Sequence, residues 1–194
     1  MNAATEPRVL QTLDGAPWDI DAYRKVGGYE AWRKCIKELS ANDIVNELKK
    51  AGLRGRGGAG FPTGIKWEKV LNHRVKEHYF VCNAGEHEPG TFKDRYLLKH
   101  APHQLIEGCL IAAYTVRAKA AFIYVNHEYH EERENLKKAL AQAKAQGFLG
   151  ANVLGSGVDI DLQVFEGHGS YVAGEETAML ESMQGRPAMP RQKP

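Results

Sequence analysis

The stretch HYFVCN at residues 78–83 decides the fold class, together with the mostly apolar stretch AAFIYV at residues 120–125. Both are short and rich in aromatic and aliphatic side chains, a composition typical of buried strands. Between them, residues 102–116 carry a helical pattern with a proline in its first turn. Strands separated by helices in this way favour parallel pairing, with both faces of the sheet covered by helices. The sequence therefore predicts an α/β fold.

The same alternation extends in both directions along the chain. Ser40 followed by Asp43 is a helix-start signal, and apolar residues then keep a helical spacing until Gly52. Further helices are expected over residues 131–146 and 175–184, and a half-buried strand over residues 160–165. The first forty residues carry several Gly and Pro residues among short polar stretches, with short helices near 19–25 and 29–38, which indicates an N-terminal arm over residues 1–40.

Composition excludes several classes of function. The chain has 194 residues with 26 Lys+Arg against 24 Asp+Glu, a formal net charge of +2 that does not favour a nucleic-acid partner. Its apolar runs are too short to span a membrane, and the N-terminus has no signal-peptide pattern, so we expect no direct membrane insertion. The three cysteines are widely spaced without C-x-x-C, and the histidine pairs lack metal-ligand spacing, so no metal site is expected.

The densest chemical motif is GLRGRGGAGFPTGIK at residues 52–66, which holds six glycines, two arginines and a lysine. Glycines let backbone N–H groups approach an anion closely, and the cations complement its charge, so this loop predicts phosphate binding. It contains G-x-G-x-x-G at residues 55–60, but a helix rather than a strand precedes it, so the ordinary dinucleotide fingerprint does not apply. A Walker A motif is absent, and a flexible surface loop is the alternative.

Two more motifs follow strands. NAGEHEPGTFKDR at residues 83–95 begins where a strand ends, which is where open α/β sheets bind ligands. Its alternative is a turn whose residues 93–95 form a solvated charge cluster. GHGSYVAGEET at residues 167–177 joins another strand end to a helix with paired acids, which alternatively only stabilise the helix dipole. From the residues alone, the sequence indicates an α/β nucleotide or flavin phosphate binder with acidic loops.

At these places the sequence closely resembles the NADH-binding, FMN-containing flavoprotein subunit of respiratory complex I and its relatives in NAD-dependent hydrogenases and formate dehydrogenases. The resemblance rests on residues 52–66, 83–95, 102–108, 174–178 and 185–194, in that order. It implies a Rossmann-like FMN/NADH-binding domain over residues 41–194. It also implies hydride transfer from NADH to FMN, with electrons passed on to iron–sulfur clusters.

The resemblance also assigns roles to residues. The positions nearest the chemistry are Glu88, Glu175 and Glu176, and the cofactor-binding positions are Gly55, Arg56, Gly57, Gly58, Ala59, Gly60, Phe61, Pro62, Thr63, Gly64, Lys66, Asn83, Gly85, Glu86, Tyr171 and Gly174. Asn83 and Glu86 would contact the flavin, whereas Glu88 and the acids after Gly174 would line the nicotinamide side.

The chain departs from the family pattern in two ways. Many relatives carry Asp where this chain has Gly85, and relatives continue past residue 194 into further flavin-binding loops, a ubiquitin-like domain and a domain holding a [4Fe–4S] cluster. We therefore expect weak FMN retention by the chain alone, and activity only with a completing partner. The implied partners are a thioredoxin-like [2Fe–2S] subunit and a [4Fe–4S] chain or domain, in a cytoplasmic position peripheral to the inner membrane. The alternatives are a hydrogenase or formate dehydrogenase diaphorase subunit, or a cofactor-free assembly module.

Overall fold

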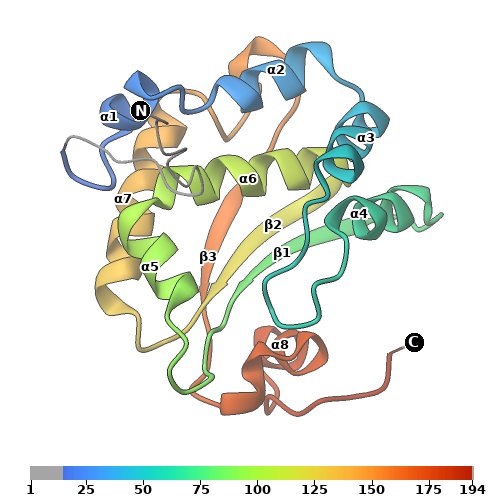
Figure 1. The fold of residues 1–194 in the computed structure, drawn as a ribbon, viewed down its shortest axis with the longest axis vertical. Helices are drawn as coiled ribbons and strands as arrows, with labels where there is room; N and C mark the ends of the chain where they lie inside the picture. Colours follow the sequence, from blue (N-terminus) through green and yellow to red (C-terminus); the bar gives the residue numbers. More distant parts are fainter. Residues whose placement is uncertain (1–14, 194) are drawn as a thin grey trace, which may run out of the picture.

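The computed structural model describes residues 15–193, and its centre is a parallel sheet of three strands, β1 (His78–Ala84), β2 (Ala118–Val125) and β3 (Leu162–Glu166). The strands lie in the order β1-β2-β3 (Figure 1), with Val81 opposite Phe122 and Ile123 opposite Val164. The predicted α/β fold with parallel pairing is thus confirmed.

One face of this sheet carries the main core. Helix α6 (Pro102–Thr115) precedes β2 on the connection from β1, and helix α7 (His130–Ala145) lies on the connection from β2 to β3. Side chains of β2 on this face, such as Ile123, are fully buried with Leu110 of α6 and Leu136 of α7. Because parallel strands must bury their apolar side chains under helices, these two connections account for most of the core.

The second face of the sheet is only partly covered. Helix α8 (Glu176–Met183) lies on it, and a smaller cluster joins Tyr124 to Met179, with Val81 and Phe165 at its margin. Beyond this cluster Tyr79 is 56% exposed. The expectation that helices cover both faces therefore holds for one face and for the carboxyl-end part of the other.

The N-terminal residues do not form a peripheral arm. Helices α1 (Ile20–Lys25) and α2 (Glu30–Glu38) pack against α6, and Trp32 is completely buried in the main core. The buried Glu107 carboxylate of α6 accepts hydrogen bonds from the N–H groups of Tyr29 and Trp32 at 2.8 and 3.0 Å. The prediction of an arm is wrong for residues 15–40 because this long-range contact leaves no local signal; residues 1–14 of that arm lie outside the described residues.

The remaining helices border the glycine-rich segment or are short. Helix α3 (Ala41–Ala51) begins with the capping box that Ser40 and Asp43 predict and ends at Gly52. Two helices were not predicted, α4 (Thr63–Asn72) and α5 (Lys93–His100), and the short turns are η1 (Val153–Gly155) and η2 (Tyr171–Gly174). Within residues 15–193, no helix combines the length and the apolar character that a membrane crossing requires.

Candidate functional site

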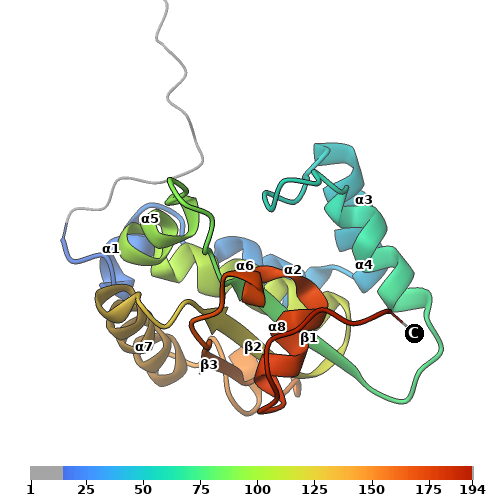
Figure 2. The same cartoon turned by 90° about the horizontal axis from the view of Figure 1, so that it is seen from below.

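The motif residues converge near the carboxyl ends of the strands. Figure 2 looks toward this end and shows α8 in front of the sheet, with the loop between α3 and α4 projecting above it. The Asn83 side chain at the end of β1 donates to the carbonyl of Gly174 in η2 at 2.7 Å. Lys66, in the first turn of α4, lies 4.0 Å from the Glu176 carboxylate at the start of α8. Three sequence motifs therefore border one region, which we call the strand-end site.

The glycine loop, residues 52–62, is a narrow excursion between α3 and α4. The N–H of Gly55 donates to the carbonyl of Phe61, and the N–H of Thr63 to that of Leu53, each at 2.9 Å, so the two limbs of the loop are tied together. At its tip Gly58 and Gly60 have φ values of +101° and +61°, which side chains strongly disfavour. The positive φ values, rather than steric crowding by neighbouring atoms, explain why positions 58 and 60 are glycine.

The tip of the loop has spare hydrogen-bond donors. Within residues 15–193, no hydrogen bond uses the N–H groups of Gly57, Gly58 or Gly60. Arg56 forms no ion pair with any described residue, and Lys66 stands at the base of the loop. Unused N–H groups and a free guanidinium are what an anionic ligand such as a phosphate requires.

An aromatic ring lies beside these donors. Phe61 is 46% exposed at the end of the glycine loop. The ammonium group of Lys69, one turn along α4 from Lys66, lies 5.7 Å from the centre of its ring. The exposed ring offers a stacking surface for a flat ligand. Sequence reasoning found Phe61 but missed Lys69, because α4 was not predicted.

Small residues allow β1 and η2 to approach each other closely. A Cβ added to Gly174 would lie 2.6 Å from the carbonyl oxygen of Gly85, so only glycine fits there without a backbone shift. Gly85 is itself crowded, since an added Cβ would lie 3.1 Å from the Tyr124 ring. Gly85 therefore suits the close packing of this chain against Tyr124.

The acidic residues of the site differ in their surroundings. Glu88 accepts a hydrogen bond from the Tyr171 hydroxyl, and this bond raises the pKa of Tyr171. Glu175 caps α8, since its carboxylate accepts from the Thr177 N–H and hydroxyl, and these bonds hold its pKa below the ordinary value. Glu176 lies between Lys66 and Lys193. Glu175 thus has the capping role expected of an acid at a helix start, while Glu88 and Glu176 remain accessible.

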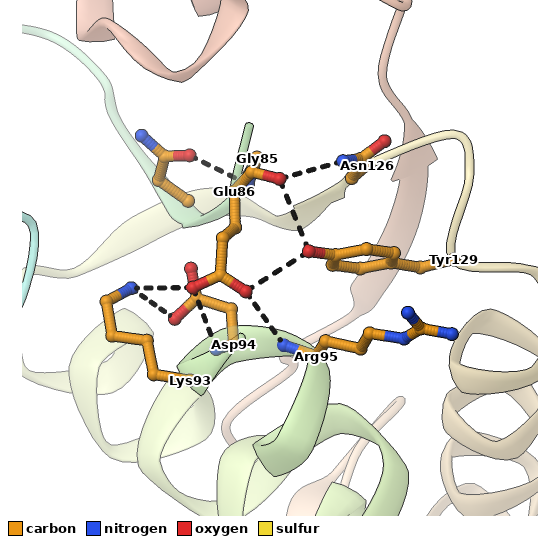
Figure 3. A network of polar contacts seen from close by, with 8 residues as sticks. Gly85, Glu86, Lys93, Asp94, Arg95, Asn126 and Tyr129 are labelled. Atoms are coloured by element: carbon orange, nitrogen blue, oxygen red, sulfur yellow. Dashed lines mark hydrogen bonds and ion pairs between the residues drawn. The ribbon is translucent and has the colours of Figure 1, made fainter. Parts of the chain in front are cut away.

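The Glu86 side chain points toward Tyr129 and the residues that begin α5 (Figure 3). Its side chain is 2% exposed, and its two oxygens accept from the N–H groups of Asp94 at 3.2 Å and Arg95 at 3.3 Å, both in the first turn of α5. The Tyr129 hydroxyl adds a bond at 3.1 Å, and Lys93 lies 3.5 Å away. The Glu86 carboxylate therefore caps α5, although Glu86 itself lies several residues before that helix. Its expected contact with a flavin stays a prediction.

The alternative of a turn with a solvated charge cluster at residues 93–95 holds only in part. The side chains of Lys93 and Arg95 are exposed, at 41% and 58%, but these residues begin helix α5. The N–H groups of Asp94 and Arg95 bind the buried Glu86 carboxylate, which favours a helix start. Sequence reasoning also missed Tyr129 and Asn126; the Asn126 amide donates to the Glu86 carbonyl at 2.8 Å. No local pattern links these residues to Glu86, which lies about forty positions earlier.

Comparison with known proteins identifies the family. Residues 48–194 match the Nuo51 FMN-binding domain of the complex I 51-kDa family. The chain belongs to this family. It is 47% identical over 182 residues to the F subunit of the NADH-quinone oxidoreductase of Escherichia coli, and the match covers 93% of this chain and 41% of that protein. It is 49% identical over 177 residues to the corresponding protein of Streptomyces coelicolor, covering 91% of this chain and 39% of that protein.

A solved structure supports the same assignment. An NAD+-reducing [NiFe]-hydrogenase in the H2-reduced state superimposes with a TM-score of 0.71 at 37% identity, covering 83% of this chain and 28% of that one. This 51-kDa-family domain thus spans about two fifths of the length of the curated relatives that it matches. The resemblance expected from the motifs is confirmed, and so is the Rossmann-like fold class.

Proposed function

We propose that this domain holds FMN and NADH at the strand-end site, as the hydride-accepting module of an NADH dehydrogenase of the NADH:quinone oxidoreductase type. The observation that carries the proposal is the glycine loop, where the N–H groups of Gly57, Gly58 and Gly60 have no hydrogen-bond acceptor among residues 15–193. The family match over residues 48–194 supports FMN as the ligand.

The residues at the site fit a flavin phosphate and a dinucleotide. Two φ-positive glycines shape the loop tip, Arg56 stands on the outgoing limb and Lys66 stands at the base of the loop, so the loop can receive a phosphate without burying an unpaired charge. The exposed ring of Phe61 offers a face for stacking, and the Asn83 amide bridges β1 to η2. FMN, when bound, supplies the ability to accept a hydride and to release electrons one at a time.

The chain's own contribution is binding, orientation and charge. In this proposal Arg56 and Lys66 neutralise phosphate, while Asn83 fixes the distance between the end of β1 and η2. Glu88 and Glu176 line the nicotinamide side, with Glu88 held by Tyr171 and Glu176 by Lys66. Carboxylates near a flavin disfavour its anionic reduced form, so these two residues lower its reduction potential.

The partners and location follow from the proposed function. The matched relatives are named as one subunit of a larger oxidoreductase, and we propose that this domain likewise passes electrons to a [4Fe–4S] chain or domain and to a thioredoxin-like [2Fe–2S] subunit. Its position would be cytoplasmic and peripheral to the inner membrane through those subunits. The hydrogenase neighbour favours a second candidate, the diaphorase subunit of an NAD-linked hydrogenase, which shares the same hydride chemistry.

Titration of the chain with FMN, followed by flavin fluorescence, tests the proposed site. The wild-type chain should quench the flavin and should bind it more tightly than the double variant Arg56→Gln, Lys66→Gln. A matched control, Lys34→Gln, Lys37→Gln on α2, keeps the same net charge as the double variant but leaves the loop intact. Equal FMN affinity in the wild type and the double variant would contradict the proposal. So would the absence of any FMN binding by the folded chain both alone and together with the completing polypeptide, a result that would favour a cofactor-free assembly module.

A further inference from the structure

Two of the three cysteines face each other where β1 packs against α6. Phe80 and Cys82 of β1 pack against the main core, whereas Val81 between them packs against the smaller cluster on the second face. Because the side chains of a strand alternate between its two faces, Cys82 points toward the helices of the main core. Cys109 of α6 is buried in the same core. The strand and the helix therefore bring two thiols together on one side of the sheet.

The two thiols differ in their surroundings. The Cys109 thiol is hydrogen-bonded to that of Cys82, and this bond together with burial raises the pKa of Cys109 well above its ordinary value. Cys109 therefore keeps its proton and donates it to the Cys82 sulfur. Cys82 is half-buried, so it is the more accessible residue of the two. The pair thus combines an accessible sulfur with a buried thiol that points at it, while the third cysteine, Cys35, is buried in α2.

Hydrogen peroxide can convert such a pair into a disulfide in two steps. The Cys82 sulfur attacks the peroxide and breaks its O–O bond, which leaves Cys82 as a sulfenic acid and releases one water. The Cys109 sulfur then attacks the sulfenic sulfur and forms the S–S bond. The displaced hydroxyl group leaves as water with the proton of Cys109. Over both steps, two thiols are oxidised, one peroxide is reduced, and the products are one disulfide and two waters.

We propose that Cys82 and Cys109 are a redox modification site, at which hydrogen peroxide joins β1 to α6 through a reversible disulfide. The pair lies beside the strand-end site, because Cys82 directly precedes Asn83, whose amide donates to the Gly174 carbonyl. A covalent S–S bond is shorter than a contact between two thiols, so the disulfide draws this end of β1 toward α6 and weakens the link to Gly174. FMN affinity should then fall, a consequence that rests on the proposed function; the disulfide itself does not.

Peptide mapping of the full chain tests this proposal. The folded chain would be reduced, freed of the reductant and treated with hydrogen peroxide, and circular dichroism would confirm that it stays folded. It would then be unfolded in iodoacetamide and digested for mass spectrometry. We expect a pair of peptides joined through Cys82 and Cys109, lighter by two hydrogen atoms than the separate peptides, while Cys35 is recovered in alkylated form. Dithiothreitol added before the iodoacetamide should return all three cysteines to the alkylated form.

Variants assign a role to each thiol. Cys82→Ser should leave the buried Cys109 unoxidised, whereas Cys109→Ala should let Cys82 continue to sulfinic acid, because no second thiol resolves its sulfenic acid. Cys35→Ser is the matched control and should form the same disulfide as the wild type. Recovery of both thiols in alkylated form from the treated wild type would overturn the proposal, as would sulfinic acid at Cys82 in the wild type. A disulfide between two chains, seen as a dimer on a non-reducing gel, would also overturn it.

FMN titration of the reduced and the oxidised chain separates this inference from the proposed function. The oxidised chain should bind FMN at least about threefold more weakly than the reduced chain, and dithiothreitol should restore the affinity. Equal affinity of the two forms would overturn the link between the disulfide and the strand-end site. If the reduced chain binds no FMN even together with the completing polypeptide, the proposed function fails, and the peptide map still decides whether the disulfide forms.

Discussion

Replacing Glu86 tests whether its carboxylate stabilises the fold or binds the flavin. Its Oε1 accepts from the N–H of Asp94 and its Oε2 from the N–H of Arg95 and the Tyr129 hydroxyl, all in a site that is nearly closed to solvent. Burial, followed by the nearby Glu86 carboxylate, raises the pKa of Tyr129, so its hydroxyl remains a donor. Hydrogen bonds to a charged group contribute about 1.5–3 kcal/mol each.

Glu86→Ala removes both acceptors and should lower the free energy of unfolding by about 3–5 kcal/mol, less than the sum of three bonds because water can reach the start of α5. Glu86→Gln keeps one oxygen but turns an amide NH2 toward the remaining donors, and should cost about 1.5–3 kcal/mol. Urea unfolding followed by circular dichroism measures both values. FMN affinity, measured on the fraction that is folded, should change less than threefold in Glu86→Gln. A variant with wild-type stability but FMN binding weakened tenfold or more would refute this reasoning and make Glu86 a flavin ligand.

Three further changes test other parts of the structure. Lys66→Gln should weaken FMN binding about tenfold, as loss of one charge-assisted contact does, whereas Lys144→Gln on α7 should leave it unchanged in the same titration. Burial lowers the pKa of His103, so as the pH falls below about 6.5 the unfolded chain takes up a proton before the folded chain does. The free energy of unfolding should therefore decrease as the pH falls from about 6.5 to the folded-state pKa. His103→Gln should flatten this part of the plot of melting temperature against pH. Gly174→Ala should destabilise the chain by about 1–3 kcal/mol and weaken FMN retention, because the added Cβ would lie 2.6 Å from a carbonyl oxygen. The control Gly108→Ala, on the exposed side of α6, should be neutral or stabilising in the same unfolding assay.

The sequence predicts the sheet well because its strands are short apolar runs and its long helices carry their own start and stop signals. The capping box at Ser40 and the proline at the start of α6 are examples, and both helices occur where these signals place them. Helix α5 was missed because its start is stabilised by Glu86, seven positions earlier and in another segment. The core role of Trp32 was missed for the same kind of reason, since the Glu107 carboxylate that fixes α2 lies 75 positions away.

In the candidate site too, features with a local cause could be predicted from the sequence, and features set by distant contacts could not. The glycine loop could be identified from the residues, because its positive φ angles at Gly58 and Gly60 are properties of glycine itself. The direction in which each acid points could not, because Glu86 and Glu88 are two positions apart and yet one is buried against α5 and the other bonds Tyr171. Tertiary contacts decide that difference, and they leave no pattern in the local sequence.

The most direct test of the central proposal is anaerobic addition of NADH to the FMN-loaded chain, with and without the completing polypeptide, while the visible absorbance of the flavin is followed. Bleaching of the flavin band by NADH is predicted, and it should be lost in the Arg56→Gln, Lys66→Gln double variant in proportion to its lost FMN. A complex that holds stoichiometric FMN but whose band is unchanged by NADH would contradict the proposal that these residues bring the two cofactors together.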